Sequence, residues 1–153
     1  MVVMEIKDPA EKQRITRLVL EALPEWFEVP ETREAYIRES KSLPLFAAFD
    51  AEKPVGFLCL KETGKATVEL HVMGVLKAYH RQGVGKELFR AAREAAVQGG
   101  YSFLQVKTVQ MGKYEDYDRT NRFYLALGFQ EFEVFPMLWD ELNPCQVYVM
   151  SLK

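Results

Sequence analysis

The spacing of apolar and polar residues along the chain predicts an alternation of strands and helices. Short apolar segments rich in β-branched or aromatic residues are expected to be strands, and apolar residues three or four positions apart indicate helices. The expected strands are residues 2–6, 45–49, 55–60, 68–75, 103–109, 129–135 and 146–152, and the expected helices are residues 9–23, 30–42, 84–98 and 118–127. The resulting order, β-α-α-β-β-β-α-β-α-β-β, predicts an α/β fold with a mixed sheet flanked by helices.

The most informative segment runs from Val68 to Ala96 and is predicted to form a strand, a turn and a helix. The turn contains Gly83 and Gly85 and no acidic residue. A helix N-terminus has unpaired N–H groups and a partial positive charge, and glycines let a phosphate approach the backbone closely. The spacing fits neither G-x-x-x-x-G-K-[ST] nor the three glycines of G-x-G-x-x-G. The segment therefore predicts a phosphate-binding turn that belongs to neither of these nucleotide-binding classes.

Two motifs of the chain resemble the GCN5-related N-acetyltransferase (GNAT) superfamily. Residues His80 to Gly85 are similar to its pyrophosphate loop, Q/R-x-x-G-x-G/A, with His80 in place of the usual Gln or Arg. Phe123-Tyr124 followed by Gly128-Phe129 is similar to its F-Y-x-x-x-G-F segment, and the likeness extends from Leu45 to the C-terminus. The resemblance implies the acyl-CoA N-acyltransferase fold, with a mostly antiparallel sheet, as one N-acetyltransferase domain over residues 1–153. It also implies acetyl-CoA as co-substrate, without a metal.

The resemblance further implies how the chain would hold acetyl-CoA. The motif strand is expected to carry a bulge that splays it from the next strand, so that main-chain groups meet the pantetheine arm and the carbonyl oxygen. These groups belong to Met73, Gly74 and Val75, and Gly74 is the residue expected at the bulge. The phosphates are expected at the turn and the helix start, which comprise Arg81, Gln82, Gly83, Val84, Gly85 and Lys86.

Transfer of an acetyl group to an amine requires a neutral amine, a donor to the oxyanion and a proton for the leaving thiolate. Glu69 precedes Gly83 by a spacing that resembles that of the glutamate base in histone-acetylating members. Glu69 is therefore the first candidate for the base, and His71, which is expected on the same face of the strand, or water remain the alternatives. Tyr124 resembles the tyrosine whose hydroxyl lies near the CoA sulfur, and is expected to be the acid. The alternative for Tyr124 is a residue of the apolar core.

One position departs from the pattern of the superfamily. In the motif N-x-x-A-x-x-F-Y the asparagine reaches the cofactor, but here Tyr117 occupies its position and Asn121 lies one turn later. The asparagine contact is therefore not transferred to Asn121. Tyr117 or Arg119 is expected to replace it, and Tyr117 is counted among the cofactor-binding residues.

The resemblance places the acceptor between the first two helices and the loop after the sixth strand. Here these regions are residues 23–30 and 135–141, and each combines aromatic with acidic residues. Trp26, Phe27 and Trp139 are expected to form an apolar wall for the substrate. The alternative is that these aromatics only close the edge of the domain.

Composition narrows the classes of function. The 153 residues are 48% hydrophobic and 27% charged, as in ordinary globular proteins. A net charge of −2 gives no support for a nucleic-acid partner, and no segment has the length of a membrane span. The N-terminus does not resemble a signal peptide, so a cytoplasmic location with two reduced cysteines is expected. The oligomeric state stays open, including a homodimer.

The sequence thus predicts an acetyl-CoA-dependent N-acetyltransferase that acts on a primary amine of a small molecule by direct transfer in a ternary complex. The bulky segments 23–30 and 135–141 favour a closed acceptor pocket. A protein N-terminal or lysine acetyltransferase, which needs an open groove, is the first alternative. A non-catalytic acyl-CoA-binding sensor is the second, and the presence of Glu69 and Tyr124 beside the phosphate-binding turn argues against it.

Overall fold

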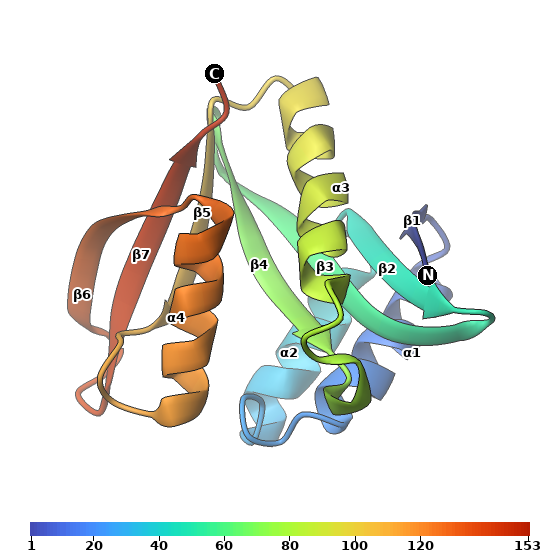
Figure 1. The fold of residues 1–153 in the computed structure, drawn as a ribbon, viewed down its shortest axis with the longest axis horizontal. Helices are drawn as coiled ribbons and strands as arrows, with labels where there is room; N and C mark the ends of the chain where they lie inside the picture. The colour runs from blue at the N-terminus through green and yellow to red at the C-terminus, as the bar shows by residue number, and fades with distance from the viewer.

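A computed structural model describes all of residues 1–153 as seven strands and four α-helices (Figure 1). The strands form one sheet in the order β1-β2-β3-β4-β5-β7-β6, in which only β4 and β5 are parallel neighbours. In chain order the elements are β1 (Val2–Ile6), α1 (Pro9–Glu21), α2 (Pro30–Ser40), β2 (Leu45–Asp50), β3 (Lys53–Gly64), β4 (Thr67–Val75), a 3-10 turn (Lys77–Tyr79), α3 (Val84–Gln98), β5 (Phe103–Val109), α4 (Glu115–Leu127), β6 (Gln130–Asp140) and β7 (Asn143–Ser151). The predicted order of elements and the predicted fold class are confirmed.

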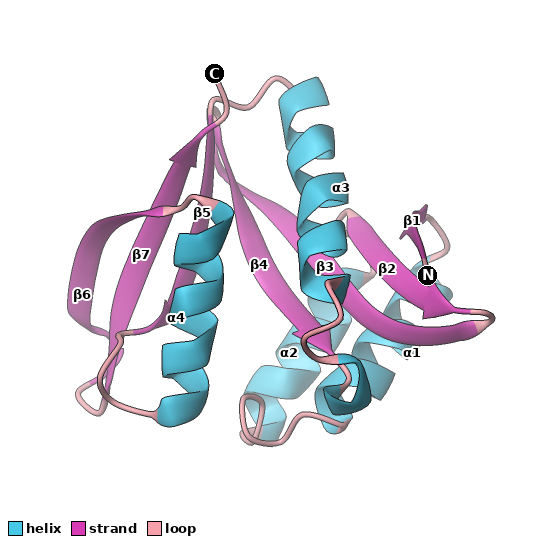
Figure 2. Cartoon of the chain, viewed as in Figure 1, coloured by secondary structure: helices cyan, strands magenta, loops and turns pink.

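The helices cover both faces of the sheet, with α1 and α2 on one face and α3 and α4 on the other (Figure 2). Helix α1 buries Ile15 and Val19 against β2, β3 and the middle of β4. Helix α3 buries Leu88 and Ala92 in a larger cluster that also contains Tyr124 of α4. None of the four helices has both the length and the apolar surface that crossing a bilayer would require.

Strands β4 and β5 pair over a short distance and then separate (Figure 1). Their parallel register joins residues 67–69 of β4 to residues 103–105 of β5, and neither strand pairs with the other beyond that point. Strand β4 continues to Val75 alongside β3, and β5 continues to Val109 alongside β7. The facing backbone edges of these two strands are therefore free of a neighbouring strand where they diverge.

The bulge in β4 lies at His71, so the prediction that places it at Gly74 is wrong. Val72 pairs with Cys59 and Leu70 pairs with Leu60, which leaves His71 as the extra residue, while Gly74 pairs regularly with Phe57. The extra residue reverses the alternation of side chains, because Leu70 packs on the α3 face and Val72 packs on the α1 face.

Gly74 instead allows helix α1 to approach the sheet. A Cβ atom at Gly74 would lie 2.9 Å from Leu23 Cδ1 and 3.0 Å from Val19 Cγ1. Val19 belongs to α1 and Leu23 follows the end of that helix, so contacts this short require these two side chains to shift. The glycine is thus a packing requirement, which a pattern of alternating residues does not distinguish from a bulge.

Several predicted boundaries also differ from those of the structure, and two of them bear on the site. Helix α4 begins at Glu115, three residues before the predicted start at Asp118. The segment predicted as a loop at residues 135–141 belongs to β6 up to Asp140, although its pairing with β7 is interrupted between Phe135 and Asp140. Residues 136–139 arch away from the sheet at that point because only Pro144 separates Asn143 from Cys145 on the opposite strand.

The substitution Gly74→Ala should lower the free energy of unfolding by about 1–3 kcal/mol, because the added methyl group overpacks the contact with α1. Urea denaturation monitored by circular dichroism measures this. Gly64→Ala is the control, since a Cβ atom there meets no atom within 4 Å. Equal stability of the two variants would contradict the packing role of Gly74.

Candidate functional site

The N-terminus of α3 presents free backbone donors. Gly83 precedes the helix in a left-handed conformation with φ +80, and no side chain caps the helix. The amides of Val84, Gly85 and Lys86 fall in the first turn, where N–H groups have no partner within the helix. By contrast, the N-terminus of α1 is capped by Asp8, whose carboxylate accepts from the amide of Glu11. The predicted phosphate-binding turn therefore has the donors that an anion requires.

Side chains of the turn fix its shape and leave two cations free. His80 Nε2 donates to the carbonyl of Val75 at 2.6 Å, and Gln82 Nε2 donates to the carbonyl of Ala78 at 3.0 Å. Both side chains thus stabilise the turn, and the carbonyl of Val75 is already used. Arg81 and Lys86 are exposed and form no ion pair within the chain. Their charges are available to an anion.

Close packing joins the start of α3 to α4 and β4. A Cβ atom at Gly85 would lie 3.1 Å from Phe123 Cζ and 3.6 Å from Met73 Cε. Gly85 is therefore needed for contact with Phe123, while Gly83 is needed for its positive φ. The first turn of α3 consequently lies beside the residue that precedes Tyr124 and beside the part of β4 that separates from β5.

Two carboxylates bind the imidazole of His71. Its Nε2 atom lies 3.1 Å from Glu39 Oε1, and its Nδ1 atom lies 3.5 Å from Glu69 Oε2. Each carboxylate also pairs with a lysine at 3.0 Å, Glu39 with Lys61 and Glu69 with Lys107. The structure thus brings Glu69 and His71 together on one face, as predicted, and adds a second acid from α2.

These contacts shift the pKa values in opposite directions. Burial by itself lowers the pKa of His71, but the hydrogen bonds to Glu69 and Glu39 outweigh it, and the pKa is raised above its usual value. Burial raises the pKa of Glu69, yet the hydrogen bonds from His71 and Lys107 outweigh that effect, and the pKa is lowered. Within this cluster, His71 is the group that accepts a proton more readily than usual.

Tyr124 lies near Glu69 but on the opposite face of the sheet, in the core cluster beneath α3. Its ring is 7% exposed and packs edge-on against Phe129 at a centroid distance of 5.8 Å. The hydroxyl forms no hydrogen bond within the chain, and it is not among the enclosed polar atoms that lack a partner, of which Arg33 Nε is the one example. Burial raises the pKa of Tyr124, with smaller contributions from Tyr36 and Glu69. The hydroxyl is therefore protonated near neutral pH and lies close enough to Tyr36 and Glu69 for their charges to affect it.

Asn121 and Tyr117, which lie near the position of the family's asparagine, have different contacts in the structure. Asn121 is fully buried, where its Nδ2 atom donates to the carbonyls of Val109 and Tyr117 and its Oδ1 atom accepts from Tyr148. Asn121 is thus committed to the core. The Tyr117 hydroxyl donates to the carbonyl of Trp26 at 3.2 Å, so it joins α4 to the segment between α1 and α2.

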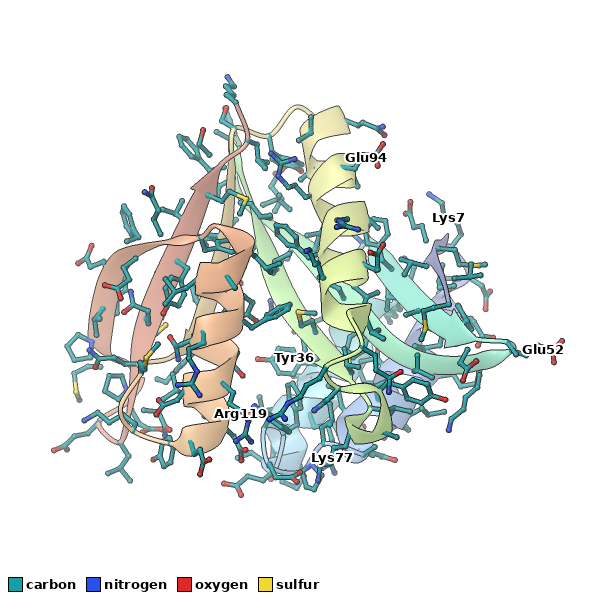
Figure 3. The ribbon with its side chains drawn as sticks, in the orientation of Figure 1. Lys7, Tyr36, Glu52, Lys77, Glu94 and Arg119 are labelled. Atoms are coloured by element: carbon teal, nitrogen blue, oxygen red, sulfur yellow. The ribbon has the colours of Figure 1, made fainter.

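Arg119 is engaged elsewhere. It forms ion pairs with Glu115 and Asp116 of its own helix, and its label in Figure 3 lies between α4 and α2. A cation that already has two acidic partners on its own helix is a poor replacement for the asparagine contact. The side chains of Tyr117 and Arg119 thus both have partners within the chain, and the replacement of the asparagine contact by Tyr117 stays a prediction.

A cavity of about 140 Å³ lies beside this cluster and is lined by Tyr36, Glu69, His71, Lys107 and Trp139. These residues come from α2, β4, β5 and β6, so the cavity lies where β4 and β5 diverge. Figure 3 shows Tyr36 in this region, and its ring packs against the His71 ring at a centroid distance of 5.3 Å. The cavity therefore offers a second substrate a place beside Glu69 and His71.

The three aromatics predicted for the acceptor side lie at different distances from the cavity. Trp139 lines it directly. Phe27 packs edge-on against Tyr36 at 6.1 Å and forms an outer layer. Trp26 packs against His80 at 6.1 Å, on the side of the phosphate-binding turn. An ion pair between Glu25 and Lys77 holds the same segment there, and Lys77 is labelled in Figure 3.

Sequence reasoning missed Tyr36, Glu39 and Lys107. Tyr36 and Glu39 are three residues apart on α2, which places them on one face of that helix. Lys107 follows Gln105 at the strand spacing of two, so both face Glu69. The helical and strand spacings show which residues share a face of α2 or of β5. Nothing in the sequence indicates that these two faces meet at β4.

His71 should titrate above its usual pKa of about 6.5, and Glu39→Gln should lower this value because one of the two carboxylates that favour the imidazolium loses its charge. Proton–carbon NMR spectra recorded against pH measure the titration, and a His80→Gln variant identifies the His71 signal. The raised pKa stabilises the folded state below about pH 6.5, and this contribution is lost as the pH rises through the folded-state value. An unchanged titration in Glu39→Gln would contradict the assigned contact.

Comparison with solved structures identifies the fold. The structure superposes on a putative GNAT acetyltransferase from Desulfovibrio desulfuricans with a TM-score of 0.84 and 16% identity, covering 99% of this chain and 100% of that one. An aminoglycoside 6'-N-acetyltransferase from Enterococcus faecium gives 0.77 and 18%, covering 100% and 98%. A putative acetyltransferase from Salmonella typhimurium, solved with acetyl-CoA, gives 0.73 and 15%, covering 100% and 95%.

Comparison of the sequence gives the family. A search of curated proteins finds no match. The family model described as the acetyltransferase (GNAT) family matches residues 12–129, which is well over half of the chain and includes the turn before α3 and the segment around Tyr124. This protein therefore belongs to the GNAT family of acetyltransferases.

Proposed function

We propose that this protein transfers the acetyl group of acetyl-CoA to the primary amine of a small molecule, with both substrates bound at once. One observation carries the proposal. The cavity beside His71 lies where β4 and β5 separate, the uncapped start of α3 packs beside the free part of β4, and Tyr124 lies close enough to Glu69 for that charge to affect its pKa.

The residues present fit acetyl-CoA. The amides of residues 84–86 and the unpaired charges of Arg81 and Lys86 suit its phosphates. The free edge of β4 up to Val75 suits the pantetheine arm, which can hydrogen-bond to an unpaired strand. Acetyl-CoA itself would supply an acyl group activated as a thioester. The similar structure from Salmonella typhimurium, which contains acetyl-CoA, supports this assignment.

His71 suits the role of proton acceptor from the attacking amine. Its raised pKa makes it a stronger base than an ordinary histidine, and a base works best when its pKa lies near the working pH. Glu69 has a lowered pKa, so it suits the role of orienting the imidazole and stabilising its charged form. Glu39 holds the second ring nitrogen and offers a path for the proton towards the surface.

Tyr124 suits the role of proton donor to the departing thiolate. Its hydroxyl stays protonated because the pKa is raised, and it has no protein acceptor to compete for its hydrogen. The proton taken from the amine at His71 and the proton given by Tyr124 balance over one turnover. The products are an amide and free CoA, and both side chains return to their starting states by exchange with solvent.

The size of the cavity supports a small acceptor. A volume of about 140 Å³ is below the range of about 300–1,000 Å³ that is usual for ligand pockets, so only a small head group fits. Trp139, in the arch of residues 136–139, lines the cavity, which favours a closed acceptor site over the open groove that a peptide needs. The unpartnered hydroxyl of Tyr124 argues against a sensor without catalysis.

Gly83→Asp should abolish acetyl-CoA binding, because it places a negative charge at the proposed phosphate site and a side chain in a left-handed conformation. Calorimetry measures the affinity. Gly100→Asp is the matched control, since Gly100 at the opposite end of α3 has φ +83 and equally open surroundings. Undiminished binding in Gly83→Asp, or equal loss in Gly100→Asp, would contradict the proposed site.

Tyr124→Phe should reduce kcat about 100-fold while acetyl-CoA affinity stays the same, because the ring is kept and only the proton donor is lost. The assay follows release of the CoA thiol with a panel of small amines and peptides, under conditions in which chemistry limits the rate. The panel also tests the proposed acceptor class.

Tyr148→Phe is the matched control for Tyr124→Phe. Its hydroxyl donates to the buried Asn121 Oδ1, so its loss should cost about 1–3 kcal/mol of stability and leave kcat unchanged. An unchanged kcat in Tyr124→Phe would instead assign Tyr124 to the core.

A further inference from the structure

We infer that the acceptor carries a carboxylate, or a similar acidic group, next to its amine, and that Lys107 binds this group. The inference rests on the proposed function and deepens it, because it names the class of acceptor and a residue that selects it. The best-fitting acceptor is therefore a small amino acid or a compound with an amino-acid head group.

Lys107 is the more exposed member of the ion pair that lines the cavity. Lys107 and Glu69 form an ion pair at 3.0 Å, but the side chain of Lys107 is 34% exposed while that of Glu69 is 7% exposed. Both side chains line the cavity, and the ammonium group is the more accessible of the two charges to an incoming ligand. An ammonium has three donors, and Glu69 is the one partner that Lys107 has within the chain. Two donors remain for a ligand.

The arrangement of Lys107 relative to His71 also bears on the acceptor. Lys107 projects from β5 and His71 from β4, and both contact the carboxylate of Glu69 between them. An amine placed at His71 and an acidic group placed at Lys107 would thus lie on opposite sides of one small cavity. An amino-acid head group places an amine and a carboxylate on the same carbon atom, which suits such a short separation.

The cavity beside His71 is small. The cavity volume of about 140 Å³ is below the range of about 300–1,000 Å³ that is usual for ligand pockets, so it suits a head group of a few heavy atoms. The rest of the acceptor would extend past Trp139, which is 47% exposed. A polyamine would place a second cation against Lys107 in the same space, and like charges at this distance repel.

Lys61 provides a matched control within the chain. It pairs with Glu39 at 3.0 Å, and Glu39 contacts His71 just as Glu69 does. Its side chain is 42% exposed, yet it does not line the cavity. Loss of Lys61 therefore removes a comparable ion pair beside His71 without removing a group that can touch the acceptor.

The experiment compares kcat/KM for small α-amino acids with kcat/KM for their carboxamides, at saturating acetyl-CoA. Each pair shares the amine and differs in the carboxylate, and the intrinsic difference in amine reactivity cancels when variants are compared. Lys107→Gln should lower the acid-to-amide ratio about tenfold, mainly through KM, because a charge-assisted hydrogen bond is lost. Lys61→Gln should leave the ratio unchanged, and Lys107→Arg should retain the preference for the acid.

Three results would overturn the inference. They are an unchanged ratio in Lys107→Gln, an equal fall in Lys61→Gln, and a wild-type protein that does not prefer amino acids over their amides or over polyamines. Transfer to amides without any preference for a carboxylate rejects the inference alone and leaves the proposed function intact. Absence of transfer to every amine, or absence of acetyl-CoA binding, rejects the proposed function together with it.

Discussion

The short pairing between β4 and β5 is the constraint on which the rest of the site depends. Parallel pairing that stops after Glu69 and Gln105 leaves two strand edges without hydrogen-bond partners inside an otherwise continuous sheet. Unpaired backbone groups are costly when they are buried, so such an opening is expected to be filled by water or by a ligand. The same opening lets side chains from opposite faces of the sheet approach one another, which a continuous sheet would prevent.

Electrostatic balance around His71 follows from that opening. Two carboxylates next to one imidazole would repel each other, but Lys61 and Lys107 neutralise them from outside. The lowered pKa values of Glu39 and Glu69 stabilise the fold above the usual carboxyl pKa, and this contribution is lost as the pH falls through the folded-state values. The raised pKa of His71 acts in the opposite direction, so the cluster favours an intermediate pH.

Much of the fold follows from local patterns, whereas the site depends on contacts across the sheet. The apolar periods of α1 and α3 and the glycine turn at Gly83 are local signals, and they predict the element order and the phosphate-binding turn. The bulge at His71 depends on the register with β3, and the use of Gly74 depends on the closeness of α1. The spacing of residues along β4 predicts neither the position of the bulge nor the packing role of Gly74.

The difference between local patterns and contacts across the sheet also determines which site residues can be predicted from the sequence. Glu69 and Tyr124 lie in motifs that resemble those of a known family, so sequence comparison alone indicates them. Glu39 and Lys107 lie outside both motifs. Glu39 contacts His71, and Lys107 contacts Glu69, only because α2 and β5 pack beside β4. Residues that define an acceptor pocket come from several elements, and local patterns predict such convergence poorly.

The arrangement of the two faces supports direct transfer in a ternary complex. Tyr124 and the start of α3 lie on one face of the sheet, and the cavity beside His71 lies towards the other, so each substrate can approach from its own side. A covalent acetyl-enzyme would need an accessible nucleophile. Both cysteines are buried, and burial raises the pKa of Cys59 to about 12 and that of Cys145 to about 11. With neither thiol able to ionise near neutral pH, attack by the amine on acetyl-CoA is the route that this arrangement favours.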